Sequence, residues 1–270
     1  MSSPPAFSAE GAGEVIVSQP GASKSVVVGI DSSLAAVNAA KWAVVEATSR
    51  GLPLRLVYVI PDGEPPHASA GAMQREPESA ETALLRAQYA VQALRKSVDV
   101  GTVLLRGDPD CVLIDESRDA AMICVGSKPH GYEPVGPVAA VLAQRAHCPV
   151  AIIRTDIYAP HITGGVIVVG LDDEPDNDVV VHMAMEEGRL RGATVRQIDS
   201  RIDSWVRRYP DVHVQIVAPG IGPEHQENHD AAIQLAVVGR ADADEITRIV
   251  IPNIHPILGY PDWSILVVRG

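Results

Sequence analysis

The feature that most constrains the fold of this chain is an internal repeat. Three apolar segments of the first part return in the same order further on: residues 25–31 as 165–172, 122–126 as 235–239, and 150–154 as 264–269. A chain of 270 residues divides readily into two domains of the usual size, roughly 100–200 residues each. The repeat therefore predicts two domains of the same architecture, with a boundary near Tyr158.

Strand-like and helix-like segments alternate within the first copy. The apolar runs that predict strands are residues 25–30, 54–60, 98–105, 122–125 and 149–153. Helical spacing lies between these runs, and it is clearest over residues 79–96. This alternation favours parallel strands joined by helical crossovers. We therefore predict an α/β fold of two tandem doubly wound domains, each built on a five-stranded parallel sheet.

The predicted organisation of the chain has three parts. Residues 1–23, rich in Ser, Pro, Gly and Ala, are expected to form a flexible N-terminal tail. The first domain is expected to span residues 24–157, and a shorter, degenerate second domain is expected to span residues 158–270. The second is shorter because the long loop and helix of residues 61–96 shrink to a brief segment around Trp205.

Composition narrows the classes of core and partner. Aromatic residues make up only 4% of the chain, so the core must be built from Val, Ala, Ile and Leu, as in buried parallel strands. The net charge of −12 disfavours nucleic acid and anionic membranes as partners. No apolar run reaches the length of a membrane span, and no secretory signal is visible. Three cysteines without a CxxC spacing fit a reducing cytoplasm.

Residues 121–154 form the segment in which we expect a ligand site. An apolar run stops at Gly126, a loop rich in Gly and Pro follows, and a helix-like run and a second apolar run complete the unit. Open α/β sheets bind ligands in loops of this kind, at the carboxyl ends of their strands.

Several separated motifs together resemble a universal stress protein domain. They are GIDSS at residues 29–33, LRLVYVI at 54–60, RGDPDCVLIDESRDAAMICVGS at 106–127 and AHCPVAIIR at 146–154. The resemblance covers residues 24–154, and residues 165–270 match as a weaker second copy, as in the tandem form of that family in bacteria. It implies an adenine-nucleotide α-hydrolase-like sheet, with an adenine-nucleotide cleft in some family members and none in others.

In its nucleotide-binding members the family carries a Gly-x2-Gly-x9-Gly-Ser/Thr loop after the fourth strand. Glycines let the backbone approach phosphates, and their N–H groups, with the next helix N-terminus, donate to them. Here Gly126 matches the first position and Gly136 the third, but Pro129 and Pro137 replace a glycine and a hydroxyl, and the loop is about three residues short. The two prolines remove two N–H donors.

By the same resemblance, the candidate cofactor-binding residues are Asp31, Ser33, Val59, Gly126, Ser127 and Gly136. Asp31 matches the acidic residue that meets adenine or ribose, and Val59 the backbone contact to adenine. The ligand implied is ATP, with Mg²⁺ as a possible companion. An alternative without a ligand stays open. In it, Asp31 caps a helix, and Gly136 and Pro137 are simply the first residues of another helix.

The second domain is not expected to bind nucleotide. Asp172 survives, but no glycine follows Gly239, and Asp242, Asp244 and Glu245 stand where phosphates would lie. No catalytic or metal-binding residues are predicted in either domain, since the chain shows no nucleophile elbow and its His225–His229 pair is better explained by a solvated polar stretch. At most we expect weak ATP hydrolysis.

Two hypotheses for function follow. In the first, the chain is a stress-response regulatory module that changes state when ATP binds in the first domain. In the second, it is a nucleotide-independent scaffold that acts through homodimerisation and partner binding. In that case the apolar final strands, residues 149–154 and 264–269, are the surfaces expected to pair or pack across an interface.

Overall fold

The computed structural model describes residues 24–62, 79–127, 135–154, 165–170, 177–198, 208–217, 233–240 and 263–269. The predicted N-terminal tail, Pro129, Trp205 and the second-domain residues Asp172, Asp242, Asp244 and Glu245 lie outside these ranges.

The first half of the fold is built as the alternating pattern predicts. Its strands are β1 (Ser25–Ile30), β2 (Leu54–Ile60), β3 (Val100–Arg106), β4 (Ala120–Gly126) and β5 (Val150–Ile153). Its helices are α1 (Leu34–Arg50), α2 (Ala80–Gln92), α3 (Pro109–Glu116) and α4 (Pro137–Arg145). The predicted bounds of β1 and β2 are confirmed, whereas α2 ends four residues earlier than expected.

The second half contains β6 (Val166–Gly170), α5 (Asn177–Arg191), β7 (Thr194–Ile198), β8 (Val214–Val217), β9 (Ile233–Val238) and β10 (Ser264–Val267). Sequence analysis located β6, β9 and β10 but not β7 or β8. These two strands were missed because Arg196, Gln197 and Gln215 interrupt what would otherwise be short apolar runs.

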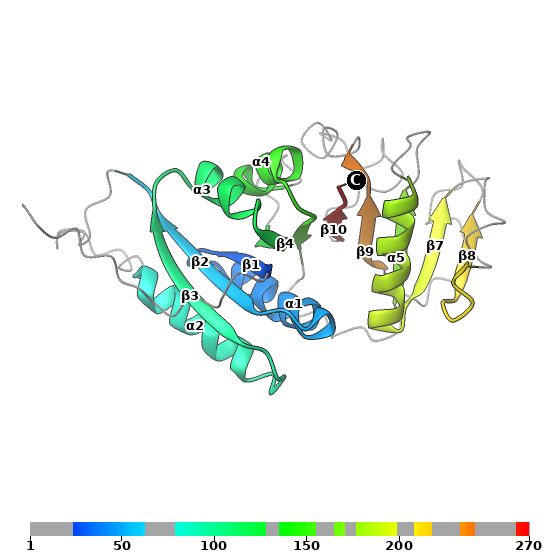
Figure 1. Cartoon of the computed structure of the whole chain (residues 1–270), viewed down its shortest axis with the longest axis horizontal. Coiled ribbons are helices and arrows are strands. Elements are labelled where there is room, and N and C mark those ends of the chain that lie inside the picture. The colour runs from blue at the N-terminus through cyan, green and yellow to red at the C-terminus, as the bar shows by residue number, and fades with distance from the viewer. Residues whose placement is uncertain are drawn as a thin grey trace, which may run out of the picture.

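The ten strands form one continuous sheet in the order β3-β2-β1-β4-β5-β10-β9-β6-β7-β8 (Figure 1). Each half is parallel throughout, and the two halves meet at β5 and β10, which pair antiparallel through Ile152 with Ile265 and Val150 with Val267. The order of the second half mirrors that of the first, so the halves are related by a pseudo-two-fold axis at this seam. The two predicted five-stranded sheets are thus present but joined edge to edge.

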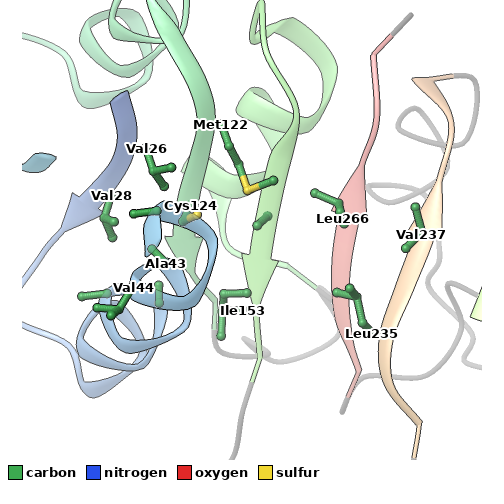
Figure 2. Packing of buried hydrophobic residues seen from close by; sticks show 14 of the residues in the cluster. Val26, Val28, Ala43, Val44, Met122, Cys124, Ile153, Leu235, Val237 and Leu266 are labelled. Atoms are coloured by element: carbon green, nitrogen blue, oxygen red, sulfur yellow. The ribbon is translucent and has the colours of Figure 1, made fainter. Parts of the chain in front are cut away.

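Helices cover both faces of the sheet, with α1 and α2 on one side and α3 and α4 on the other (Figure 1). Helix α5 packs on the same face as α1, because its buried residues belong to the same apolar cluster. That cluster crosses the seam. Figure 2 shows Ile153 of β5 followed by Leu266 of β10 and Val237 of β9. None of the described helices is long and apolar enough to cross a membrane.

Local signals fix the ends of the helices. Ser33 caps α1, with its hydroxyl accepting a hydrogen bond from the Ala36 N–H at 3.1 Å. Gly51 and Gly192 follow α1 and α5 with φ angles of 63° and 58°, a left-handed conformation that side chains with a Cβ rarely adopt. Asp108 caps α3, and Pro109 occupies its first position.

Four buried or half-buried ionisable side chains join α1 to α5 across the seam. Each helix carries a glutamate and an arginine four residues apart, Glu46 with Arg50 and Glu187 with Arg191. Both glutamate side chains are fully buried. Each arginine also reaches the glutamate of the other helix: Arg50 lies 3.4 Å from Glu187, and Arg191 pairs with Glu46. We call these four residues the seam network.

Two further side chains contact the arginines of the seam network. Each lies one helical turn before the glutamate of its own helix. The Arg191 guanidinium lies 4.5 Å from the centre of the Trp42 ring, a cation–π contact. The Met183 sulfur lies 3.6 Å from Arg50 Nη2. Trp42 is half-buried and packs between the core and this cation.

Burial and the nearby Glu187 carboxylate oppose ionisation of Glu46, while Arg191 and Arg50 favour it. Burial and the Glu187 carboxylate outweigh the two arginines, so the pKa of Glu46 rises to about 8. The folded protein therefore holds the Glu46 proton more tightly than the unfolded chain, in which the pKa is near 4.5.

This difference predicts a pH-dependent stability. The stabilisation from protonated Glu46 is complete below pH 4.5 and is lost as the pH rises through 8. We expect the free energy of unfolding, measured by urea titration, to fall across this window by up to about 1.4 kcal/mol per pH unit. Glu46→Gln, which imitates the protonated carboxyl, is expected to remove this part of the slope.

Glu81→Gln, at an exposed position in the first turn of α2, is the matched control and is expected to retain the wild-type slope. An identical slope for Glu46→Gln and the wild type would contradict the role given to Glu46.

Candidate functional site

The predicted site residues come together at the carboxyl edge of the first half. β1 lies between β2 and β4, and Gly29 pairs with Val57 on one side and Val125 on the other. Asp31, Val59 and Ser127 each follow these paired residues by two positions. The three residues therefore lie in line along one edge of the sheet, which is where parallel α/β folds bind ligands.

Asp31 lies exposed at the start of the loop that joins β1 to α1. Its Oδ1 atom accepts a hydrogen bond from the Ser33 N–H at 2.8 Å, which closes a tight local turn. The Ser33 hydroxyl accepts from the Ala36 N–H, so this side chain serves as the N-cap of α1. The N-cap of α1 is therefore Ser33, so the alternative in which Asp31 caps this helix is wrong. Asp31 instead shapes the preceding turn and remains exposed to solvent.

Gly126 has a packing role that is independent of any ligand. A Cβ atom at this position would lie 2.2 Å from the carbonyl carbon of Ala35 and 2.4 Å from the Ala36 nitrogen. The first turn of α1 therefore packs directly against the end of β4, and no side chain fits between them.

Ser127 and Gly136 are joined by a hydrogen bond that closes the loop between β4 and α4. The Gly136 N–H donates to the Ser127 hydroxyl at 3.0 Å, and the Ser127 N–H donates to the Ile153 carbonyl at 3.0 Å. Ser127 is buried, at 5% exposure. Its hydroxyl is therefore a fixed part of the loop as well as a candidate ligand contact.

The N-terminus of α4 is open in a way that the N-terminus of α1 is not. Gly136 is its N-cap, and no side chain caps the helix. Pro137 at the first position has no N–H, so the donors of the first turn are the N–H groups of Val138 and Ala139. The positive end of the helix dipole thus points toward the edge that carries Asp31 and Ser127, and within the described part of the chain no side chain neutralises it.

Val59 contributes only backbone to this edge. Its side chain is 8% exposed and belongs to the apolar cluster under α3 and α4. Its predicted role, a backbone contact to adenine, requires no side chain and is compatible with this burial.

Arg86 is a residue of this edge that sequence analysis missed. It lies on α2, and its Nη2 atom donates to the Ser32 carbonyl at 2.8 Å, within the loop that holds Asp31 and Ser33. Nothing in the helical spacing of α2 distinguished Arg86 from an ordinary solvated arginine, because the contact spans 54 residues.

Comparison with known proteins identifies the family. A sequence model of the universal stress protein family matches residues 22–154. Universal stress protein Rv2624c of Mycobacterium tuberculosis is 40% identical over 265 residues, covering 91% of this chain and 96% of the relative. The chain belongs to the universal stress protein family.

Two further comparisons agree. Universal stress protein Rv2028c of the same organism is 35% identical over 266 residues, covering 90% of this chain and 95% of the relative. Among solved structures, a universal stress protein from Archaeoglobus fulgidus superimposes with a TM-score of 0.64 at 15% identity, covering 91% of this chain and 96% of that one. The structural match supports the fold.

The cysteines of this universal stress protein are free thiols. Cys124 and Cys148 are buried, and burial raises the pKa of both, that of Cys148 to about 11. Cys148 therefore serves as a small buried apolar side chain, since a thiol with this pKa is a poor nucleophile at neutral pH. Among the residues that the structure describes, no group of three or more potential ligands is placed to hold a metal ion.

The two candidate glycines are expected to respond differently to substitution. Gly126→Ala is expected to lower the free energy of unfolding by about 1–3 kcal/mol or more, because its Cβ meets the backbone of α1. Gly136→Ala has an open position, with Ser127 Oγ at 4.0 Å as its nearest neighbour, and is expected to cost less than about 1 kcal/mol. Urea unfolding of both variants measures the difference, and equal losses would contradict the packing role of Gly126.

Proposed function

We propose that this universal stress protein is a cytoplasmic stress-response regulatory protein that binds one adenine nucleotide at the carboxyl edge of its first half. The observation that carries this proposal is the N-terminus of α4, which has no side-chain cap and lies beside Ser127 on the edge that also carries Asp31. A helix end of this kind attracts phosphate groups.

Each residue of the edge has a part in the proposed complex. The N–H groups of Val138 and Ala139 donate to phosphate oxygens, in place of the donors that Pro129 and Pro137 remove. Asp31, exposed at the end of β1, accepts hydrogen bonds from the ribose or adenine. The Val59 backbone contacts adenine. The ligand proposed is ATP, alone or with Mg²⁺, and we propose binding as the function, with hydrolysis at most slow.

The first test is to denature the purified protein, assay the supernatant for adenine nucleotide, and then titrate ATP calorimetrically. We expect about one nucleotide per chain, and Asp31→Ala is expected to weaken binding. Gly136→Asp is the sharper variant. Aspartate is a favourable N-cap, so it is expected to stabilise α4 by about a few tenths of a kcal/mol relative to glycine, while its carboxylate repels phosphates.

A variant that folds more stably and loses ATP separates ligand binding from structural damage. Gly101→Asp, at a glycine of β3 with no atom within 4 Å of an added Cβ, is the control for added charge and is expected to bind ATP normally. Equal ATP affinity in wild type and Gly136→Asp would contradict the phosphate site at α4.

The alternative function is a nucleotide-independent scaffold, and one observation favours it. The hydroxyls of Ser33 and Ser127 are already engaged within the protein, by Ala36 and Gly136. In this reading the edge is a closed turn structure and the protein acts through association. The final strands are not available for that association, because β5 and β10 pair with each other. No released nucleotide and no heat at millimolar ATP would favour the scaffold.

A further inference from the structure

We propose that Arg269, in the second half of the chain, is a positioning residue for the nucleotide site of the first half, which it serves by anchoring the far end of α4. This inference rests on the proposed function, because it concerns the same site. Under this proposal the second half, in which no nucleotide site is expected, contributes to the site of the first half.

Arg269 makes three hydrogen bonds to the C-terminal turn of α4. Its Nη1 atom donates to the Gln144 carbonyl at 3.2 Å, and its Nη2 atom donates to the carbonyls of Leu142 and Ala143 at 3.2 and 2.5 Å. These carbonyls belong to the last turn, where the helix itself supplies few donors. A cation at this end also complements the negative pole of the helix dipole.

The pairing of β5 with β10 brings Arg269 to this place. Val267 of β10 pairs with Val150 of β5, and β5 begins five residues after α4 ends. Because the two strands are antiparallel, the end of β10 lies beside the beginning of β5. Arg269 therefore leaves the carboxyl edge of the second half and meets the base of a helix that belongs to the first.

Helix α4 connects the anchor to the proposed site. It has nine residues, so its ends are about 13 Å apart at the usual rise per residue. Its N-terminal turn faces the site, while Ala139, Leu142 and Ala143 are buried against the sheet. A helix this short moves as one body, so loosening its C-terminal end displaces the Val138 and Ala139 donors at the other end.

The contact requires the shape of a guanidinium as well as its charge. Arg269 is half-buried, and burial, together with the neighbouring Arg240, lowers its pKa. Burying this cation next to another is unfavourable, and the hydrogen bonds to the three carbonyls offset the lost hydration. A lysine offers a single ammonium nitrogen and cannot span three successive carbonyls in the same way.

The test compares Arg269→Gln and Arg269→Lys with Arg189→Gln. Arg189 also belongs to the second half and forms an exposed ion pair with Asp211, so it is the matched control. We expect Arg269→Gln to speed amide hydrogen exchange in residues 137–145 and to weaken ATP binding, measured by calorimetry, roughly five- to tenfold. Arg269→Lys is expected to fall between wild type and Arg269→Gln, and Arg189→Gln to match wild type.

A second readout separates positioning from general stability. In the wild type, bound ATP is expected to slow exchange along the whole of α4. In Arg269→Gln this protection is expected to be weaker along the whole of α4, although the strands exchange as in wild type. If Arg269→Gln does not fold, Arg269→Lys supplies the same comparison.

The outcomes distinguish the two proposals. Unchanged exchange in α4 and unchanged ATP affinity in both Arg269 variants would overturn the anchor while leaving the nucleotide site intact. Failure of the wild type to bind ATP would overturn the proposed function and, with it, the positioning role, even if the exchange measurements still showed that Arg269 holds α4.

Discussion

The antiparallel pairing of β5 with β10 is the constraint on which the rest of this structure depends. Each half ends in a strand that is apolar on both faces and would otherwise leave an open sheet edge. Pairing the two strands satisfies both edges at once and places α1 beside α5. The seam network then follows, because two helices related by a pseudo-two-fold axis bring identical Glu-x3-Arg pairs together. The approach of Arg269 to α4 follows from the same pairing.

The carboxyl edge of the first half shows how the needs of folding limit the groups that a ligand could use. Gly126 is required by the packing of α1, and Ser33 is required as a cap, whether or not a ligand binds. What remains for a ligand is the exposed carboxylate of Asp31 and the open N-terminus of α4. A family motif read as a list of residues therefore overstates the number of groups that a ligand can use, and the hydrogen bonds of the folded chain identify those that are left.

Most of the fold was predictable from sequence because its signals are local. Apolar runs of the right length located β1 and β2. β7 and β8 could not be predicted from the sequence, because polar residues interrupt their apolar runs and only pairing within the sheet makes them strands. The seam network escaped for a different reason. A glutamate and an arginine four residues apart ordinarily form a solvated surface pair, and only the joining of the two halves buries them. Arg86 and Arg269 likewise act over long separations in sequence, which no local pattern records.

The seam within the chain has a consequence for how the protein responds to its own abundance. Two separate subunits joined along such an edge would dissociate on dilution, and their stability would depend on protein concentration. Here the partner surface is covalently attached, so the assembled state is present at any expression level. A chain built in this way needs no second copy to close this sheet edge, so the seam forms in every folded molecule.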